Sequence, residues 1–164
     1  SIFKKALSKL EVGDEVSIFN FKSNMVLRRD DKPLVLLSQG LAMSTMRPLI
    51  KKFEIDSSNI PELISLNVNK KDNHLYEKDF ECVDGSAFIK YWIESRRDYL
   101  EKLADLAKKK SDAYFYVVGS EIFVLDTLYI LRENGIKNDQ IIIDKDLEKR
   151  DVVFETLENY NIII

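Results

Sequence analysis

Two short segments of the sequence have the composition of phosphate-binding turns. Residues 38–45 read Ser-Gln-Gly-Leu-Ala-Met-Ser-Thr, and a second segment reads Gly119-Ser120-Glu121. Each follows an apolar run and precedes an amphipathic pattern, which places backbone N–H groups at the start of a helix, where the partial positive charge favours phosphate. Gly40 and Gly119 leave room for a ligand to approach the backbone closely. Small residues of this kind also end strands and cap helices without binding anything, so composition leaves both interpretations open.

Five short apolar runs are predicted to position these turns. The run at Leu34–Leu37 follows Pro33 and is typical of a strand buried on both faces. The other four runs lie at Leu63–Val68, Phe88–Ile93, Tyr114–Val118 and Ile141–Ile143. Since amphipathic helical patterns separate most of them, the sequence predicts a doubly wound α/β fold with a five-stranded parallel sheet. Ligands of such sheets bind beyond the carboxyl ends of the strands, where both turns are expected to lie.

The ends of three helices can be predicted from single residues. The first helix contains Pro48, which favours Thr45 over Ser44 as its N-cap, because proline is tolerated only near a helix start. Ser95 is expected to cap the second helix in a capping-box pattern. Gly135 is expected to end the third as a C′ residue.

The two ends of the chain read differently from its middle. Residues 3–27 carry short strand-like patterns around the turn signal Gly13-Asp14, and a domain boundary is expected near residues 30–33. At the other end, residues 144–164 show no single pattern, and the terminal Ile162–Ile164 fits either an edge strand or a contact patch. The opening reads like sequence from inside a domain, so we expect the chain to be part of a longer protein.

Composition excludes several classes of function. The chain has 164 residues, 45% of them hydrophobic, which is enough for one core. Its net charge of −3 gives no general reason to bind nucleic acid or an anionic membrane. One cysteine and one histidine give a disulfide framework or a zinc site too few ligands. No apolar run approaches the roughly 18 residues of a membrane-spanning helix, and a cytoplasmic location is expected.

The order of these segments resembles the C-terminal part of ferredoxin–NADP reductase-like oxidoreductases over nearly the whole chain. The stretch LEVGDEV at residues 10–16 is similar to the "L-x-x-G-D-x-V" of that family's flavin-binding barrel. Three further segments correspond in order: residues 32–47 to the first strand and its "G-G-x-G-x-T-P" turn, 66–80 to the second strand and "L-Y-x-x-E", and 116–136 to "Y-x-C-G-P" and the closing helix. The resemblance implies two units, a remnant of the flavin barrel at 1–31 and an NAD(P)-binding α/β domain at 32–164.

The chain departs from the family pattern inside both turns. Gln39 replaces the first glycine of the glycine-rich turn, Ala42 replaces the third, and Thr45 stands where the family has proline. Val118 replaces a cysteine found near the nicotinamide in many members, and Ser120 replaces a proline. The family's flavin motif "R-x-Y-S" belongs to a part of the barrel upstream of residue 1. This chain alone is therefore expected to hold flavin poorly or not at all.

The resemblance implies that this chain presents NADPH or NADH to a flavin. The flavin, FAD, would be bound by a domain upstream of residue 1. Electrons would then pass to a protein or a small-molecule acceptor. Ser95 and Arg96 match a Ser-Arg pair that holds the adenosine 2′-phosphate in some members, although a helix cap and a solvated arginine explain them slightly better. The remaining cofactor-binding residues implied are Gly40, Leu41, Ser44, Thr45, Gly119, Ser120 and Glu121.

Two alternatives stay open at this point. The altered glycine turn also fits a regulatory or docking domain of the same fold whose nucleotide site is degenerate. The same crevice also fits another nucleotide or phosphate ligand. The redox interpretation requires that the turns after the first and fourth strands lie together and that Gln39 does not fill the space between them.

Overall fold

A single parallel sheet organises the chain. The computed structural model describes residues 2–17, 19, 23–69, 74–80, 87–158, 160 and 162. All the strand pairs are parallel, and the spatial order is β3-β2-β1-β4-β5. The bounds of the strands are β1 Leu34–Gln39, β2 Leu63–Val68, β3 Phe88–Ile93, β4 Tyr114–Val118 and β5 Ile141–Ile143. The predicted five-stranded α/β fold is confirmed.

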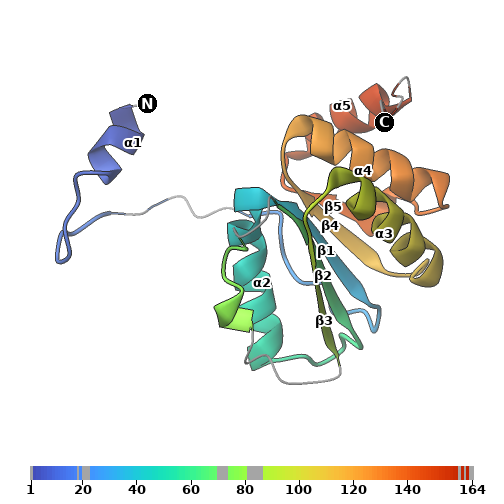
Figure 1. Ribbon diagram of the computed structural model, residues 1–164, viewed down its shortest axis with the longest axis horizontal. Helices are drawn as coiled ribbons and strands as arrows, with labels where there is room; N and C mark the ends of the chain where they lie inside the picture. The colour runs from blue at the N-terminus through green and yellow to red at the C-terminus, as the bar shows by residue number, and fades with distance from the viewer. Residues whose placement is uncertain are drawn as a thin grey trace.

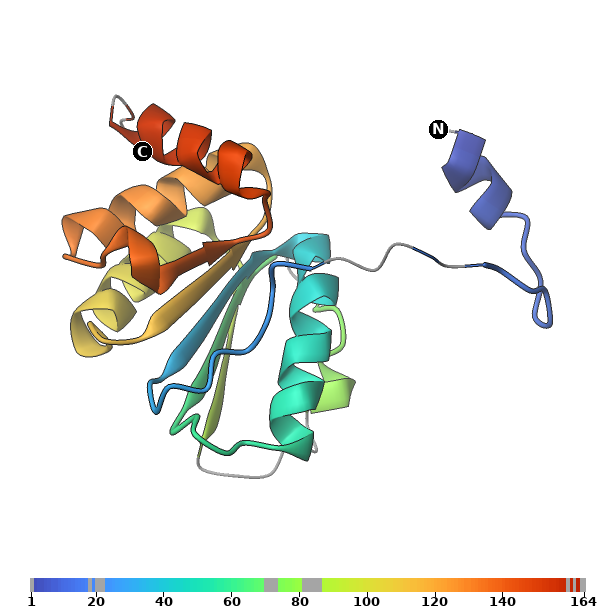
Figure 2. The same cartoon turned by 180° about the vertical axis from the view of Figure 1, so that it is seen from behind.

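Helices cover both faces of the sheet. One face carries α2 (Met43–Ile55), and the opposite face carries α3 (Arg96–Lys109), α4 (Glu121–Glu133) and α5 (Leu147–Leu157) (Figures 1 and 2). Strand β1 is buried from Leu34 to Ser38, because helices pack on it from both sides. The order of the strands reverses between β1 and β4, which pair directly, so the turns that follow them open at the same edge.

The described part of the N-terminal segment does not form the strands that its sequence indicates; residue 18 and residues 20–22 lie outside the described residues. Helix α1 (Ile2–Leu7) lies apart from the sheet in both views, and no strand occurs among the described residues before Leu34 (Figures 1 and 2). A short strand needs a partner to satisfy its backbone, and no sheet lies beside α1. Met25 and Leu27 pack instead into the core under α2, so the α/β core includes residues from before 32.

A tyrosine fixes the entering chain to the sheet. The Tyr116 hydroxyl accepts a hydrogen bond from the backbone N–H of Arg28 at 2.9 Å and donates one to the carbonyl of Val26 at 2.7 Å. Burial raises the pKa of this phenol. In this way a loop, rather than a second helix, covers part of the sheet face on which α2 packs.

Two predicted helix ends are confirmed and one is wrong. Ser95 caps α3 by accepting from the N–H of Asp98 at 3.1 Å. Gly135 follows α4 with φ +81°, and its N–H bonds to the carbonyl of Arg132, as a C′ glycine does. Thr45, however, does not cap α2. A 3₁₀ turn at Gly40–Ala42 runs straight into that helix, which places Pro48 inside it.

Most of the C-terminal region, for which the sequence shows no single pattern, forms a helix. Helix α5 begins after β5 and packs Phe154 and Leu157 into the same core as α3 and α4. Ile162 is not in a strand, and Ile163 and Ile164 lie outside the described residues.

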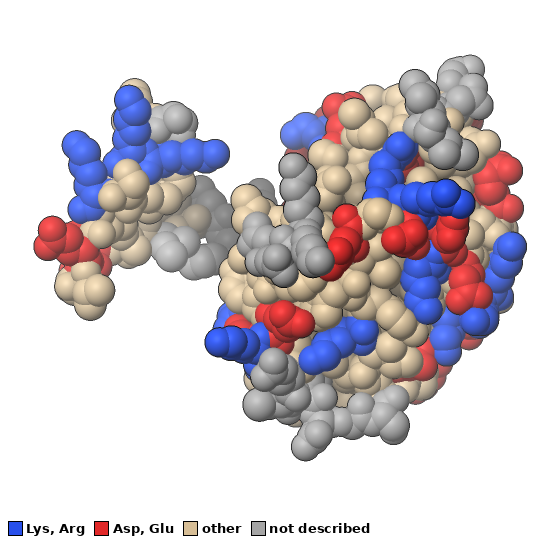
Figure 3. Space-filling view, viewed as in Figure 1, with Lys and Arg blue, Asp and Glu red and all other residues tan. Residues whose placement is uncertain are grey.

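The described surface mixes charges of both signs. Figure 3 shows Lys and Arg interspersed with Asp and Glu over the region that α3 and α4 cover, where ion pairs such as Arg97–Glu101 and Lys109–Asp105 occur. Over the described ranges, no helix has the length and apolarity needed to cross a bilayer. The same ranges contain no group of three His, Cys, Asp or Glu side chains arranged to hold a metal ion.

Candidate functional site

The structure brings every sequence-predicted site residue to the carboxyl edge of the sheet, but not into one group. Gly40, Leu41, Ser44 and Thr45 follow β1, the pair Ser95–Arg96 follows β3, and residues 119–121 follow β4. The Ser95–Arg96 pair follows β3, which β2 separates from β1, but Arg96 still lines a cavity together with Gln39 at the end of β1. Two residues of the predicted set, Arg96 and Ser120, line a common cavity.

Gln39 spans the space between the turns after β1 and β4. Its side-chain oxygen accepts a hydrogen bond from the Ser120 hydroxyl at 2.8 Å and a longer one from the Ser120 N–H at 3.4 Å. The two turns do lie together, as the redox interpretation requires. The open passage expected between them is, however, narrowed by this side chain, since glutamine reaches across where a glycine would leave room.

The cavity lies beside Gln39, between the first turns of α3 and α4. It has a volume of about 230 Å³. Its lining combines apolar and aromatic side chains with a few polar ones. The lining residues are Gln39, Val68, Arg96, Tyr99, Leu100, Ser120, Ile122, Phe123 and Asp126. This volume is below the roughly 300–1,000 Å³ of pockets for drug-sized ligands, so the cavity fits one end of a dinucleotide rather than the whole molecule.

Two aromatic rings form the floor of this cavity. Tyr99 and Phe123 lie with their ring centroids 5.0 Å apart. The Tyr99 hydroxyl is buried and shares a hydrogen bond of 2.9 Å with the Thr127 hydroxyl, and burial raises the pKa of this phenol far above its usual value. The floor is therefore rigid and uncharged at neutral pH.

Arg96 reaches the rim of the cavity as half of an ion pair. Its Nε and one terminal nitrogen donate to the same carboxylate oxygen of Asp126, Oδ2, at 2.9 and 2.6 Å. Asp126 is buried, whereas the Arg96 side chain is 47% exposed. The other carboxylate oxygen, Oδ1, accepts a hydrogen bond of 2.7 Å from the Tyr160 hydroxyl. Arg96 thus lies at the site predicted for it, but the anion that holds it is the Asp126 carboxylate of the chain itself.

The N-terminus of α4 opens onto the same cavity. Ser120 caps the helix, and its hydroxyl accepts from the N–H of Phe123 at 3.4 Å. The N–H groups of Glu121 and Ile122 belong to the first helical turn, where the helix itself supplies no acceptor. A phosphate at this point would meet backbone donors and the positive end of the helix dipole.

The N-terminus of α2 is less suited to phosphate than its sequence indicates. The N–H of Met43 is taken by the carbonyls of Gly40 and Leu41. The Ser44 hydroxyl donates to the carbonyl of Leu41 at 2.8 Å, and the Leu41 side chain is exposed. None of Gly40, Leu41, Ser44 and Thr45 lines the cavity between α3 and α4.

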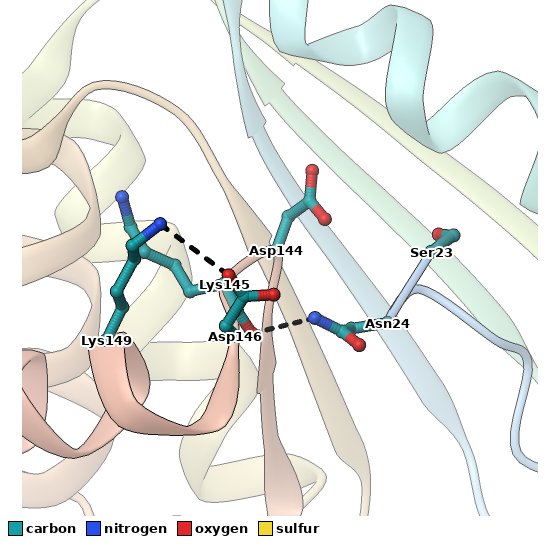
Figure 4. A pocket seen from close by; sticks show the side chains of 6 residues that line it. All are labelled: Ser23, Asn24, Asp144, Lys145, Asp146 and Lys149. Atoms are coloured by element: carbon teal, nitrogen blue, oxygen red, sulfur yellow. Dashed lines mark hydrogen bonds and ion pairs between the residues drawn. The ribbon is translucent and has the colours of Figure 1, made fainter. Parts of the chain in front are cut away.

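A second hollow lies where β5 ends and α5 begins. It has a volume of about 260 Å³ and is lined by six polar residues, which Figure 4 shows: Ser23, Asn24, Asp144, Lys145, Asp146 and Lys149. Asn24 donates to the backbone carbonyl of Lys145 at 2.8 Å, and Lys149 pairs with Asp146 at 3.5 Å (Figure 4). Its two acidic and two basic side chains balance, so the hollow has no excess of either charge.

Sequence reasoning missed Asp126, Tyr99 and Tyr160. Asp126 and Thr127 interrupt an otherwise apolar stretch in the middle of α4, and both are buried. A carboxylate in such a stretch needs a partner, because unpaired buried charges are strongly unfavourable. That signal predicts a partner for Asp126 but not its identity, since Arg96 and Tyr160 are 30 and 34 residues away in the chain.

The fold and its edge define a class of domain. The parallel sheet in the order β3-β2-β1-β4-β5, with helices on both faces and a cavity at the carboxyl edge, is a Rossmann-like α/β fold of the ferredoxin reductase type. The sequence itself matches no protein-family model and no curated protein.

Solved structures with this fold include two ferredoxin reductases and a domain of a hydrogenase. Ferredoxin-NADP+ reductase from Plasmodium falciparum superposes with a TM-score of 0.64 at 11% identity, covering 89% of this chain and 66% of that enzyme. The C-terminal domain of PF1911 hydrogenase from Pyrococcus furiosus superposes with a TM-score of 0.55 at 10% identity, covering 76% of this chain and 99% of that domain. The ferredoxin reductase in carbazole 1,9a-dioxygenase gives 0.54 at 12% identity, with 70% and 37% covered. These neighbours confirm, at the level of the fold, the resemblance to ferredoxin–NADP reductase-like proteins.

Proposed function

We propose that this chain is the nucleotide-binding part of an NAD(P)H-dependent flavin oxidoreductase. It binds a nicotinamide nucleotide at the carboxyl edge of the sheet and presents it to FAD held by a domain upstream of residue 1. Hydride passes from the nicotinamide to the flavin, and electrons pass on to an acceptor. The cofactors supply this chemistry, and the protein holds their rings in contact.

One observation carries the proposal. The cavity of about 230 Å³ lies at the edge where the strand order reverses, and it joins an apolar, aromatic floor to the N-terminus of α4. An adenosine group needs an apolar slot for its base and donors for its phosphates, and the cavity offers both. We therefore assign the adenosine end to the space between α3 and α4.

The other end of the nucleotide is assigned to the turn after β4. Gly119, Ser120 and Glu121 would flank the nicotinamide, and Gly119 borders a further hollow of about 170 Å³ at the ends of β4 and β5. Gly40, Leu41, Ser44 and Thr45 would then contact the nucleotide from the β1 side. In this arrangement Gln39 must release Ser120 for the dinucleotide to lie across both turns.

The contact between Gln39 and Ser120 also favours a second function. A side chain that narrows the passage between the two turns is what a domain with a degenerate nucleotide site would have, in which case the fold would serve regulation or docking. Titration with NADH and NADPH separates the two functions. Binding below millimolar concentration supports the oxidoreductase, and its absence at millimolar concentration supports the second function.

A carboxylate at the rim of the cavity should weaken nucleotide binding. Ile122→Glu places a negative charge in the first turn of α4, beside the proposed phosphate position. Glutamate is favourable there for the helix dipole, so the fold should be retained. We expect the dissociation constant for NADH to rise by about tenfold, which corresponds to about 1.4 kcal/mol. Isothermal titration calorimetry measures the change.

The matched control is the same substitution at the other end of a helix. Ile55 is the last residue of α2, is 86% exposed and lies at the amino edge of the sheet. Ile55→Glu should bind NADH as the wild type does. Equal affinities of Ile122→Glu and the wild type would argue against a nucleotide at this rim.

A further inference from the structure

We propose that Asp126 determines nucleotide specificity, directing the site toward a nucleotide without a 2′-phosphate, NADH rather than NADPH, by holding Arg96 in an internal ion pair. The inference rests on the proposed function, because it concerns which nucleotide the same site accepts. From the sequence alone, the Ser95–Arg96 pair is a candidate for binding the 2′-phosphate of NADPH; with Arg96 held by Asp126, the same pair disfavours it.

The geometry of Arg96 shows that one phosphate-binding edge of its guanidinium, Nε and a terminal nitrogen, is engaged. Phosphate is recognised by parallel N–H groups of the guanidinium. In this chain, Nε and a terminal nitrogen both point at Asp126 Oδ2, at 2.9 and 2.6 Å. A phosphate approaching Arg96 would meet a guanidinium whose charge a carboxylate already neutralises.

Asp126 is fixed by more than Arg96. Its side chain is 4% exposed, so it cannot turn toward water when a ligand arrives. Tyr160, which follows α5, donates its hydroxyl to Asp126 Oδ1 at 2.7 Å. Burial, together with the Asp126 carboxylate, raises the pKa of Tyr160 to about 12, so this donor stays protonated at neutral pH. The Asp126 carboxylate is thus held in place from both sides.

Two unfavourable contributions follow for a 2′-phosphate. Pulling Arg96 away would leave a buried carboxylate without its cation, which is strongly destabilising. Leaving Arg96 in place would put the phosphate next to the negative charge of Asp126. A ribose hydroxyl brings no charge, so NADH avoids both, and a hydroxyl at that position can donate to a carboxylate.

The test compares two probes that differ only in the 2′-phosphate, 5′-AMP and adenosine 2′,5′-bisphosphate, titrated calorimetrically into the full chain. For the wild type, we expect the bisphosphate to bind no more tightly than 5′-AMP. For Asp126→Asn, which keeps the shape but removes the charge, we expect the bisphosphate to gain at least tenfold relative to 5′-AMP. Asp126→Asn combined with Arg96→Ala should lose this gain, because the gain comes from the arginine that Asp126 no longer neutralises.

Asp105→Asn is the control, since it removes an exposed carboxylate of α3 that pairs with Lys109; it should keep the wild-type ratio. Tenfold tighter binding of the bisphosphate by the wild type would overturn the inference, as would an unchanged ratio in folded Asp126→Asn. If Asp126→Asn does not fold, the wild-type ratio decides alone. If 5′-AMP binds but the affinity of the bisphosphate relative to 5′-AMP differs from that expected, only this inference fails. If neither probe binds at millimolar concentration, the proposed function fails as well.

Discussion

Replacing Gly119 with alanine is expected to destabilise the folded chain by about 2–3 kcal/mol and to weaken nucleotide binding more than tenfold. A Cβ at this position would overlap the ring of Phe123, with Cγ of that ring only 2.9 Å away. Phe123 is buried, packs on Tyr99 and lines the cavity, so it cannot move without changing the cavity floor. Urea unfolding measures the stability, and calorimetry with 5′-AMP measures the binding.

Gly135→Ala is the matched control for this substitution. Gly135 has φ +81° and no atom within 4 Å of an added Cβ, so alanine there introduces backbone strain without a clash. We expect a loss of about 1 kcal/mol and unchanged binding. If Gly119→Ala proved as stable as the wild type, the close packing of Phe123 on Gly119 would be wrong.

Alkaline pH is expected to unfold this chain through its buried tyrosines. Tyr99, Tyr116 and Tyr160 all have pKa values raised by burial. Unfolded tyrosines lose their protons near pH 10, whereas the folded chain keeps them, so the unfolded state binds fewer protons above that pH. The stability these phenols contribute is therefore complete below pH 10 and is lost as pH rises above it. For Tyr99, which is fully buried, the loss approaches about 1.4 kcal/mol per pH unit.

Tyr99→Phe isolates this contribution. At pH 7 the variant should be less stable by about 1 kcal/mol, because Thr127 loses its hydrogen-bond partner. Between pH 10 and 11.5 the variant should lose about 1–2 kcal/mol less than the wild type, since it has no phenol to ionise. Tyr76→Phe, which removes an exposed phenol, should lose stability with pH as the wild type does. Urea unfolding at each pH measures these changes in stability. If Tyr99→Phe and the wild type lost the same stability with rising pH, a buried phenol at Tyr99 would be contradicted.

Local patterns predicted the sheet well because each strand is a contiguous run. The bounds of β2, β4 and β5 agree with their apolar runs, and the caps at Ser95 and Gly135 depend on residues within one turn of the helix end. The predicted start of α2 was wrong because a 3₁₀ turn without a polar cap leads into the helix. No characteristic residue type marks such a start in the sequence. The strands expected within residues 3–27 failed because a strand also requires a neighbour, which sequence patterns do not supply.

The location of the candidate site could be predicted from the sequence, but the contacts between its side chains could not. Sequence placed the two turns at one edge, and the direct pairing of β1 with β4 brings them together. The ion pair of Arg96 with Asp126, the reach of Gln39 to Ser120 and the bond from Tyr160 all join residues that are distant in the chain. Such contacts depend on how α3, α4 and the C-terminal segment pack, and no local pattern encodes that packing.

Nucleotide binding at the carboxyl edge can be measured directly by titrating NADH into isotopically labelled chain and following the backbone amide resonances. The binding proposed here should shift the amides of Arg96, Ser120 and Ile122 in a saturable way at submillimolar NADH. Ile55, Ala113 and Ile136, at the amino edge, should stay unchanged. No saturable shift up to millimolar NADH, or shifts confined to the amino edge, would contradict a nucleotide site between α3 and α4.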